Sequence, residues 1–288
     1  MPRLMAYVLV ALVGILAGGL AVTLAPKPRP PVDAAAVRAI VAEMLAERDA
    51  ETKPPMSLAS IDPGELNPLI EDFLMGDPRI LQRLSTALDA TLREEKSERN
   101  RVAIARLAED IFNDPDQVVL GNPEGDVTLV EMFDYNCSYC RSSLPDMLTL
   151  MAEDPNLRMV LKEFPILSPG SMAAAQVGVL VNAAKADYLA FHEALFTGAG
   201  PVTADTALQM AATLGLDPAV LKAQMESEAV GRIIQKSYAI ADALDISGTP
   251  TYIIGEEVIP GAIGIDELRR RIANMRACGK SLCPGDQG

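Results

Sequence analysis

Apolar residues return every three or four positions through much of the first third of the chain, which is the spacing of one face of an α-helix. The pattern predicts three helices. The first spans Asp33 to about Arg48, and the second begins near Leu66 and stops at the Gly76-Asp77-Pro78 break. The third carries an apolar ridge that continues through a charged segment: Ile80, Leu84, Leu88, Leu92, Ile104, Leu107 and Ile111.

Such a ridge needs a partner surface, because a thin helical hairpin cannot bury its apolar faces alone. Either it packs on the rest of the chain or it self-associates. We favour self-association, and we therefore predict that residues 32–114 form an N-terminal helical region that makes the protein a homo-oligomer.

Near Pro115 the pattern changes from helical spacing to short apolar runs that are typical of strands. Strands are predicted at Val118–Leu120, Val127–Phe133 and Leu157–Phe164, with a helix from Cys140 to Met151 between the last two. Strand, helix and strand within such a short length indicate a βαβ unit with parallel pairing.

The remainder of the sequence alternates helical and strand patterns again. Residues 168–245 are predicted to be an inserted helical subdomain, followed by a β-hairpin around Gly255 and a closing helix from Asp266 to Arg276. Residues 115–288 are therefore predicted to be one α/β domain.

The segment from Leu4 to Ala25 is uncharged and almost wholly apolar, and a Pro-rich linker follows it. It is long enough to span a bilayer core, which needs roughly 20 residues. A cleaved signal peptide is the alternative, although its apolar part is usually roughly 7–15 residues long. We predict that residues 1–31 form an inner-membrane anchor and linker, and that the rest of the chain lies in the periplasm or another extracytoplasmic space.

Composition excludes one class of partner. The 288 residues carry a formal net charge of -14, whereas nucleic-acid binding needs clustered Lys and Arg. With 49% hydrophobic and 22% charged residues, the sequence is typical of a globular protein rather than a disordered one.

Candidate chemistry lies in the 4 cysteines, which occur as two close pairs, Cys137 with Cys140 and Cys278 with Cys283. Cys137 follows a strand and opens a helix, where free N–H groups and the helix dipole stabilise a thiolate. Cys140 lies one turn further on and can resolve a mixed disulfide internally. This dithiol needs no cofactor and no metal.

The segment from Val130 to Arg141, VEMFDYNCSYCR, resembles the active-site segment of DsbA-like periplasmic oxidoreductases, which have a thioredoxin fold. Three further segments resemble the same family in the same order: Leu161–Leu167, Phe191–Leu195 and Gly248–Thr251. The resemblance covers roughly Val118 to Arg276. It implies a thioredoxin fold with a helical insertion, protein substrates that carry thiols or disulfides, and a membrane redox partner.

The resemblance also implies roles for single residues. Glu131 matches the buried acid of the family and Lys162 its basic partner, which together handle the proton of Cys140. A structural ion pair between these two residues is the alternative. Pro250 matches the cis-proline that pairs its main chain with the substrate.

Two departures from the strongly oxidising members of the family point to a weaker oxidant. Ser138 and Tyr139, which are expected to contact the substrate, replace a Pro-His pair, so no imidazolium lies between the cysteines. Thr249 before Pro250 resembles the residue found in isomerase-type members.

The run from Leu66 through Phe112 resembles the oligomerising segment of the ScsC-like branch, so we predict an oligomeric enzyme that leans towards disulfide isomerisation or reduction. A monomeric dithiol oxidase and a chaperone or copper-handling scaffold are alternatives. A zinc site built from the four cysteines and a hydrolase that uses Cys137 with His192 are weaker ones. His192 is expected to be structural or on the surface. Cys278 and Cys283 are expected to form a structural disulfide, with a second redox centre as the alternative.

Overall fold

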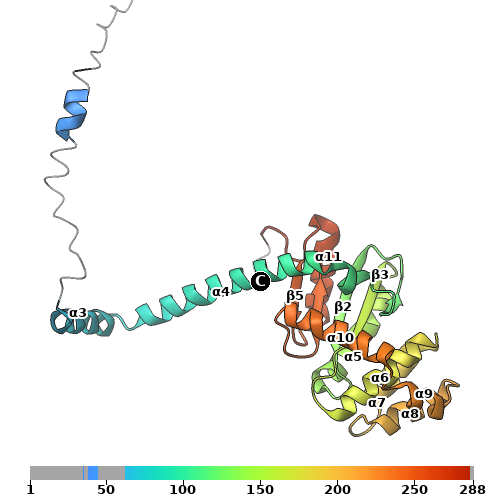
Figure 1. The fold of residues 1–288 in the computed structure, drawn as a ribbon. Coiled ribbons are helices and arrows are strands. Elements are labelled where there is room, and N and C mark those ends of the chain that lie inside the picture. Colours follow the sequence, from blue (N-terminus) through green and yellow to red (C-terminus); the bar gives the residue numbers. More distant parts are fainter. Residues whose placement is uncertain (1–34, 36–37, 45–61, 286–288) are drawn as a thin grey trace, which may run out of the picture. The chain divides into compact units, whose positions relative to one another are not determined.

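The computed structural model describes residues 35, 38–44 and 62–285 (Figure 1). The chain divides into two compact units between Leu81 and Gln82. The predicted membrane segment from Leu4 to Ala25, the linker after it and both ends of the first predicted helix lie outside the described residues. Within the described ranges, no helix combines the length and the apolar character that a membrane crossing requires.

The first unit contains a helical segment at 38–44, helix α3 (Pro63–Gly76) and the start of helix α4 (Arg79–Arg106). Asp62 caps α3, because its carboxylate accepts a hydrogen bond from the Gly64 N–H at 3.1 Å and Pro63 opens the helix. The predicted break after Gly76 separates the two helices. There the Asp77 carboxylate accepts a hydrogen bond from the first N–H of α4 at 3.2 Å.

The second unit is built on a five-stranded sheet in the order β1-β3-β2-β4-β5. The central pair, β2 with β3, is parallel, as the βαβ pattern predicted, and the other pairs are antiparallel. The strands are β1 (Val118–Gly121), β2 (Val127–Phe133), β3 (Leu157–Glu163), β4 (Thr251–Ile254) and β5 (Glu257–Pro260).

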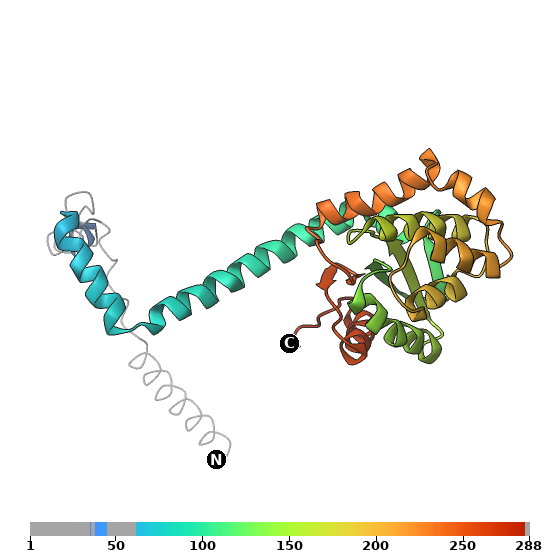
Figure 2. The ribbon, with the colours of Figure 1, turned by 90° about the horizontal axis from the view of Figure 1, so that it is seen from below.

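Helices connect these strands and cover the sheet (Figure 2). One helix crosses over from β2 to β3, five helices are inserted between β3 and β4, and the last helix follows β5. This is the predicted α/β domain with its helical insertion. The helices are α5 (Ser138–Glu153), α6 (Pro169–Ala183), α7 (Tyr188–Thr197), α8 (Ala204–Thr213), α9 (Pro218–Gln224), α10 (Glu228–Ala243) and α11 (Ile265–Cys278).

Side chains of a strand alternate between the two faces of a sheet, so β2 contributes to two separate cores. Leu129 and Phe133 pack with residues of α5 to α9, the first half of α10 and α11 on what we call the α5 face. Val130 and Met132 pack with residues of α10 on the opposite face, which we call the α10 face.

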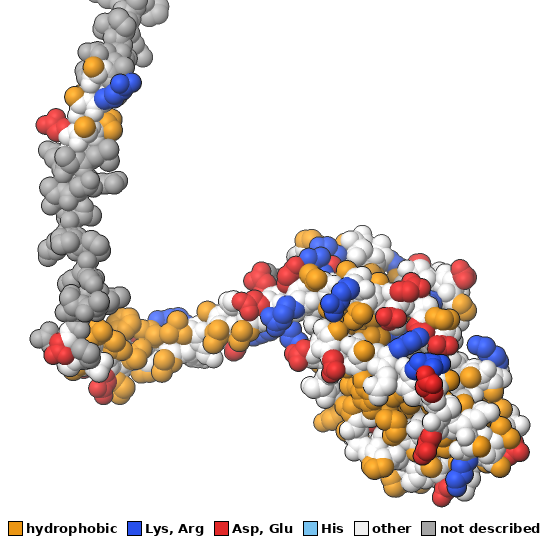
Figure 3. Space-filling view, viewed as in Figure 1, with side chains coloured by type: hydrophobic (Ala, Val, Ile, Leu, Met, Phe, Trp, Pro, Cys, Tyr) orange, Lys and Arg blue, Asp and Glu red, His pale blue; other side chains and the backbone are white. Residues whose placement is uncertain are grey.

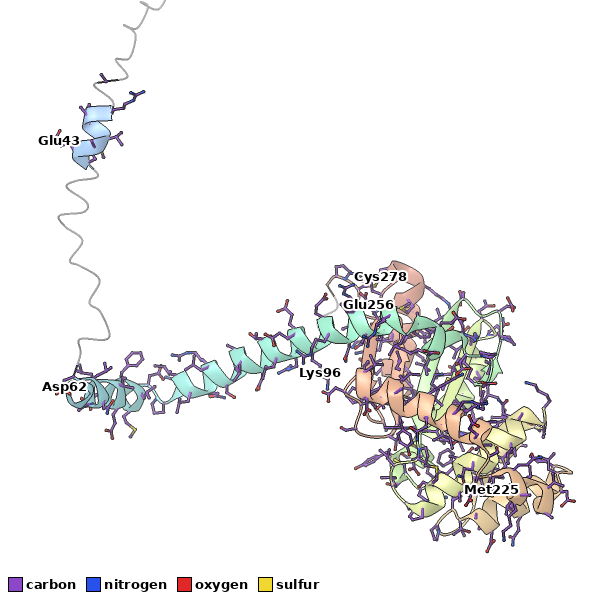
Figure 4. All side chains as sticks on the ribbon, viewed as in Figure 1. Glu43, Asp62, Lys96, Met225, Glu256 and Cys278 are labelled. Carbon is purple, nitrogen blue, oxygen red and sulfur yellow. A yellow bond between two sulfur atoms is a disulfide. The ribbon has the colours of Figure 1, made fainter. Side chains whose placement is uncertain are left out.

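The end of the predicted helical region belongs to the α10 face. Ile104 of α4 and Ile111 of the π-helical turn η2 (Glu109–Asn113) are buried there against the sheet. Lys96 of α4, labelled in Figure 4, also forms an ion pair with Asp245 before β4, with 2.7 Å between Nζ and Oδ2. The rest of the chain therefore covers the carboxyl-terminal part of the apolar ridge. The boundary near Pro115 remains a prediction.

Candidate active site

Cys137 and Cys140 lie at the amino-terminal end of α5, just beyond β2. Cys137 is the N-cap residue, with φ -81° and ψ 120°, and its carbonyl accepts a hydrogen bond from the Arg141 N–H at 3.0 Å. Both residues are free thiols, and Cys140 is the more deeply buried. The first turn of a helix has unpaired N–H groups and the positive end of the dipole, which is a position that favours negative charge.

The loop before β4 approaches the same sulfur atom. The Thr249–Pro250 peptide bond is cis, and the Cys137 thiol donates a hydrogen bond to the Thr249 carbonyl at 3.1 Å. The residue after β5 holds this loop in place, because the Gly261 N–H donates a hydrogen bond to the Pro250 carbonyl at 2.8 Å. The structure thus brings Cys137, Cys140, Thr249 and Pro250 together from segments that are far apart in the sequence.

The two residues between the cysteines face solvent. Ser138 is exposed, and the Tyr139 side chain is 67% exposed although it is aromatic. The Tyr139 carbonyl is held inside the first turn, since it accepts hydrogen bonds from the hydroxyls of Ser142 and Ser143 at 2.8 and 2.9 Å. The side chain is therefore free to contact an incoming polypeptide while its backbone stays fixed.

Glu131 lies on the α5 face beneath the cysteines and is only 4% exposed. Burial raises its pKa from 4.5 to about 8. Burial also raises the pKa of Cys140 well above its ordinary value, and the nearby Glu131 carboxyl raises it further. A carboxyl that titrates close to neutral pH beside a buried thiol is suited to exchange a proton with it.

Lys162, the predicted partner of Glu131, lies on the other side of the sheet. In the parallel register Glu131 is opposite Leu161, whereas Lys162 is opposite Met132 and shares the α10 face with it. Its ammonium donates hydrogen bonds to the Asp110 carbonyl at 2.7 Å and to Gln117 Oε1 at 3.0 Å. The expected pairing with Glu131 is therefore corrected, because alternation along β3 turns the Lys162 side chain away from the cysteines.

The environment of Lys162 suits an anchor rather than a proton carrier for Cys140. Burial lowers its pKa from 10.5 to about 8, although Asp114 and Asp110 act in the opposite direction. Both hydrogen-bond acceptors belong to the segment that runs from η2 to β1, Asp110 within η2 and Gln117 after it. Lys162 thus fastens that segment to the central strand β3.

Asp134 was not singled out from the sequence, yet it fixes the loop between β2 and Cys137. One carboxylate oxygen accepts a hydrogen bond from the Asn136 N–H at 2.7 Å. The other accepts from the N–H groups of Ile166 and Leu167 at 2.8 and 3.0 Å, so the loop after β3 is held beside the active-site loop. An Asp two residues before Asn in a turn is a recognisable signal for the first of these bonds.

A chain of four buried polar groups lies deeper on the α5 face. The Tyr188 hydroxyl donates to Glu163 at 2.7 Å and lies 3.1 Å from the Tyr135 hydroxyl, which is 3.3 Å from His192 Nδ1. Burial lowers the pKa of His192 to about 3 and raises that of Glu163 well above its usual range. His192 is therefore an interior residue whose polar contact is with Tyr135.

The second pair of cysteines, Cys278 and Cys283, forms a disulfide at the end of α11. Their sulfur atoms are bonded to each other and so are not available as thiolate ligands, which disfavours a zinc site shared with Cys137 and Cys140. Asn274 Nδ2 braces the loop by donating to the Ser281 carbonyl at 2.9 Å.

Residues 128–273 match the protein family described as the DSBA-like thioredoxin domain. The chain belongs to this family. The match begins in β2 and ends in α11, so it includes the dithiol, the cis-proline loop and the whole helical insertion.

The structures of similar proteins have been solved. A thioredoxin-like oxidoreductase from Silicibacter pomeroyi is 39% identical, with 59% of this chain and 98% of that chain covered and a TM-score of 0.57. ScsC from Proteus mirabilis, in a transitional conformation, is 25% identical over 72% of this chain and 93% of that chain, with a TM-score of 0.53.

Curated relatives include disulfide bond formation protein D of Bacillus subtilis, which is 26% identical over 54% of this chain and 75% of that protein. The Na(+)/H(+) antiporter NhaA 1 of Salinispora arenicola is 29% identical over 60% of this chain. The chain spans only 27% of the length of that antiporter.

Proposed function

We propose that this protein is a thiol–disulfide oxidoreductase that acts on protein disulfides through Cys137 and Cys140. The observation that carries the proposal is the contact between the Cys137 thiol and the carbonyl of Thr249, next to the cis-proline. It sets a nucleophilic sulfur at a helix N-terminus beside a loop main chain to which an extended polypeptide can bind.

The proposed reaction follows from this geometry in two steps. The Cys137 thiolate attacks one sulfur of a client disulfide, forms a mixed disulfide and releases the other client sulfur as a thiolate. Cys140 then loses its proton to the ionised form of the Glu131 carboxyl, whose pKa is about 8, and attacks the Cys137 sulfur, which releases the second client sulfur as a thiolate. The client gains two electrons and the enzyme becomes a disulfide, which a dithiol donor in the membrane is proposed to reduce again.

Two serine substitutions test the assignment of roles. Cys137→Ser should abolish turnover in an insulin-reduction assay, whereas Cys140→Ser should accumulate mixed disulfides with client proteins, because it keeps the attacking sulfur and lacks the resolving one. Non-reducing gels with mass spectrometry of the adducts give the readout. The Cys278→Ser/Cys283→Ser double variant is the control and should retain turnover. Equal trapping by both single variants would contradict the assignment.

We further propose that the protein is an oligomer that favours disulfide isomerisation or reduction. Leu84, Leu88 and Leu92 of α4 follow one another at intervals of four and are 60%, 58% and 50% exposed. Figure 3 shows apolar side chains along the first part of this helix. Further copies that cover this ridge would gather two or more Cys137 thiolates around one client and raise their effective concentration.

Replacing the three leucines together with Gln tests the oligomer without removing any buried residue. Light scattering should report the mass of an oligomer for the parent chain and that of a monomer for the triple variant. The triple variant should also refold scrambled ribonuclease more slowly than the parent chain when the two are compared at equal concentrations of Cys137. Val220→Gln on α9, where the side chain is 51% exposed, is the control. A monomeric parent chain would favour the monomeric oxidase.

We also propose that the domain acts outside the cytoplasm and is anchored through Leu4–Ala25. The apolar character of that segment and the Cys278–Cys283 disulfide support this, because disulfides persist in oxidising compartments. Recovery of the intact amino terminus in the membrane fraction is the expected result. A soluble protein that begins after residue 25 would indicate a cleaved signal peptide instead.

A further inference from the structure

Asn136, the residue directly before Cys137, connects the active-site loop to the helical insertion. Its Oδ1 accepts a hydrogen bond from the Val202 N–H at 2.8 Å, and its Nδ2 donates to the Val202 carbonyl at 3.0 Å. The side-chain amide thus pairs with the main chain of Val202 in the way that a neighbouring strand would. The Asn136 Nδ2 also donates to the hydroxyls of Ser171 and Ser168 at 3.2 and 3.3 Å.

The partners of Asn136 come from two parts of the insertion. Ser168 is the N-cap residue of α6, and Val202 lies between α7 and α8. Val202 is 5% exposed and Ser171 is 1% exposed, so these hydrogen bonds lie in the interior and little water competes for them. The insertion therefore offers a rigid surface to the residue that precedes the nucleophile.

A second residue holds the same segment from the other end of the motif. Arg141, directly after Cys140, donates hydrogen bonds to the carbonyl of Phe196 and, at 2.8 Å, to that of Gly198. Phe196 is in the last turn of α7 and Gly198 caps it. Asn136 and Arg141 thus lie on either side of the dithiol motif, and both donate hydrogen bonds to the end of α7 or to its connection to α8.

The geometry points to Asn136 as a positioning residue through which the helical insertion holds Cys137 in its N-cap conformation. Asn136 and Cys137 share a peptide bond, so fixing one side chain restricts the backbone of the next residue. A thiolate gains from the helix N-terminus only while it stays at the cap, because the effect falls off within the first turn. This inference rests on the proposed function in one respect, namely that Cys137 is the attacking sulfur.

The test compares two asparagines in the full chain. Asn136→Ala removes the hold on the active-site loop. Asn182→Ala is the matched control, because Asn182 on α6 is also half-buried and also donates to two carbonyls, those of Asp116 and Gln117, at 3.2 and 3.3 Å. Both variants should lose thermal stability, since each loses side-chain hydrogen bonds to the main chain.

Only Asn136→Ala should change the reactivity of Cys137. Its alkylation by iodoacetamide at neutral pH, assigned by peptide mass, should slow by about three- to fivefold, which is the scale of a charge at a helix terminus. The equilibrium with glutathione should shift towards the enzyme disulfide by a similar factor, or about 14–21 mV, because the reduced form loses the stabilised thiolate. Ser171→Ala, which leaves the active-site segment unaltered and weakens the hold from the insertion, should give a smaller shift in the same direction.

An alkylation rate and glutathione equilibrium within 1.5-fold of the parent chain for Asn136→Ala would overturn the inference, as would an equal shift in Asn182→Ala. If Asn136→Ala does not fold, Ser171→Ala decides the question by the same two readouts. Neither readout requires client turnover. If the parent chain fails to reduce insulin, the proposed function is wrong. The alkylation rate still decides the role of Asn136 in that case.

Discussion

The two faces of the sheet bury Glu131 and Lys162 at neighbouring positions, but in different surroundings. On the α5 face, Glu131 lies beneath Cys140. Burial raises the pKa of both groups, and the Glu131 carboxyl raises that of Cys140 further. On the α10 face, the Lys162 ammonium donates hydrogen bonds to the Asp110 carbonyl and to Gln117 Oε1. The comparison indicates that proton chemistry is confined to the α5 face, whereas the α10 face attaches the helical region to the domain.

The largest effect is expected for Glu131→Gln. The folded-state pKa of Glu131 is about 8 and its ordinary value is 4.5, so between these pH values the unfolded chain has lost a proton that the folded chain keeps. Stability then falls as pH rises, by about 1.4 kcal/mol per unit. Because Gln does not titrate, the variant should gain stability over the parent chain through this window, up to roughly 4 kcal/mol at pH 8.

Urea unfolding of the reduced proteins at pH 4.5, 6 and 8 measures this difference, and Glu124→Gln in an exposed loop is the control. The resolving step of Glu131→Gln should also slow, since Cys140 loses its proton acceptor. A stability difference that does not change with pH would show that the pKa of Glu131 is the same in the folded and unfolded chains, so that its carboxyl does not titrate near neutral pH and is not tuned to exchange a proton with Cys140.

Lys162→Met should show most clearly that the two faces have different roles, because it should lower stability without changing the dithiol. The substitution keeps the length of the side chain but leaves the Asp110 carbonyl and Gln117 Oε1 without their donor, which should cost about 2 kcal/mol in unfolding free energy. The equilibrium with glutathione should remain within twofold of the parent chain. A clear shift in that equilibrium would mean that Lys162 acts on the dithiol through the sheet, and the separation of the faces would be wrong.

The sequence predicts most of the sheet because the strands on either side of the motif are short segments rich in apolar residues. The predicted strand Val127–Phe133 coincides with β2, and the predicted βαβ unit is present with parallel β2 and β3. The cysteines could also be located in advance, since Cys-x-x-Cys between a strand and a helix has few other uses in an α/β domain.

The register of β3 could not be predicted in the same way. A shift of one residue along a strand turns a side chain to the opposite face, and the resemblance that paired Lys162 with Glu131 does not resolve such a shift. The structure sets Leu161, not Lys162, opposite Glu131.

Long-range partners were missed for a related physical reason. Asn136 binds Val202, which is 66 positions away, and a polar residue in a turn gives no indication of a partner at that distance. The apolar ridge from Ile80 to Ile111 likewise appears uniform in the sequence. The structure buries Ile104 and Ile111 on the α10 face and leaves Leu84 exposed, because helical periodicity does not specify what covers each turn.

The smallest expected effect concerns a single hydroxyl on each face. Tyr238 of α10 donates to the Pro165 carbonyl at 2.6 Å and is half-buried, whereas Tyr135 is 1% exposed and contacts both Tyr188 and His192. Tyr238→Phe should cost about 1 kcal/mol, since water can reach the carbonyl that it leaves. Tyr135→Phe should cost more, roughly 2 kcal/mol, because its partners stay buried without replacement. Urea unfolding at pH 7 compares the two losses of unfolding free energy. If Tyr135→Phe costs no more than Tyr238→Phe, hydrogen bonds on the α5 face contribute no more to stability than those on the α10 face.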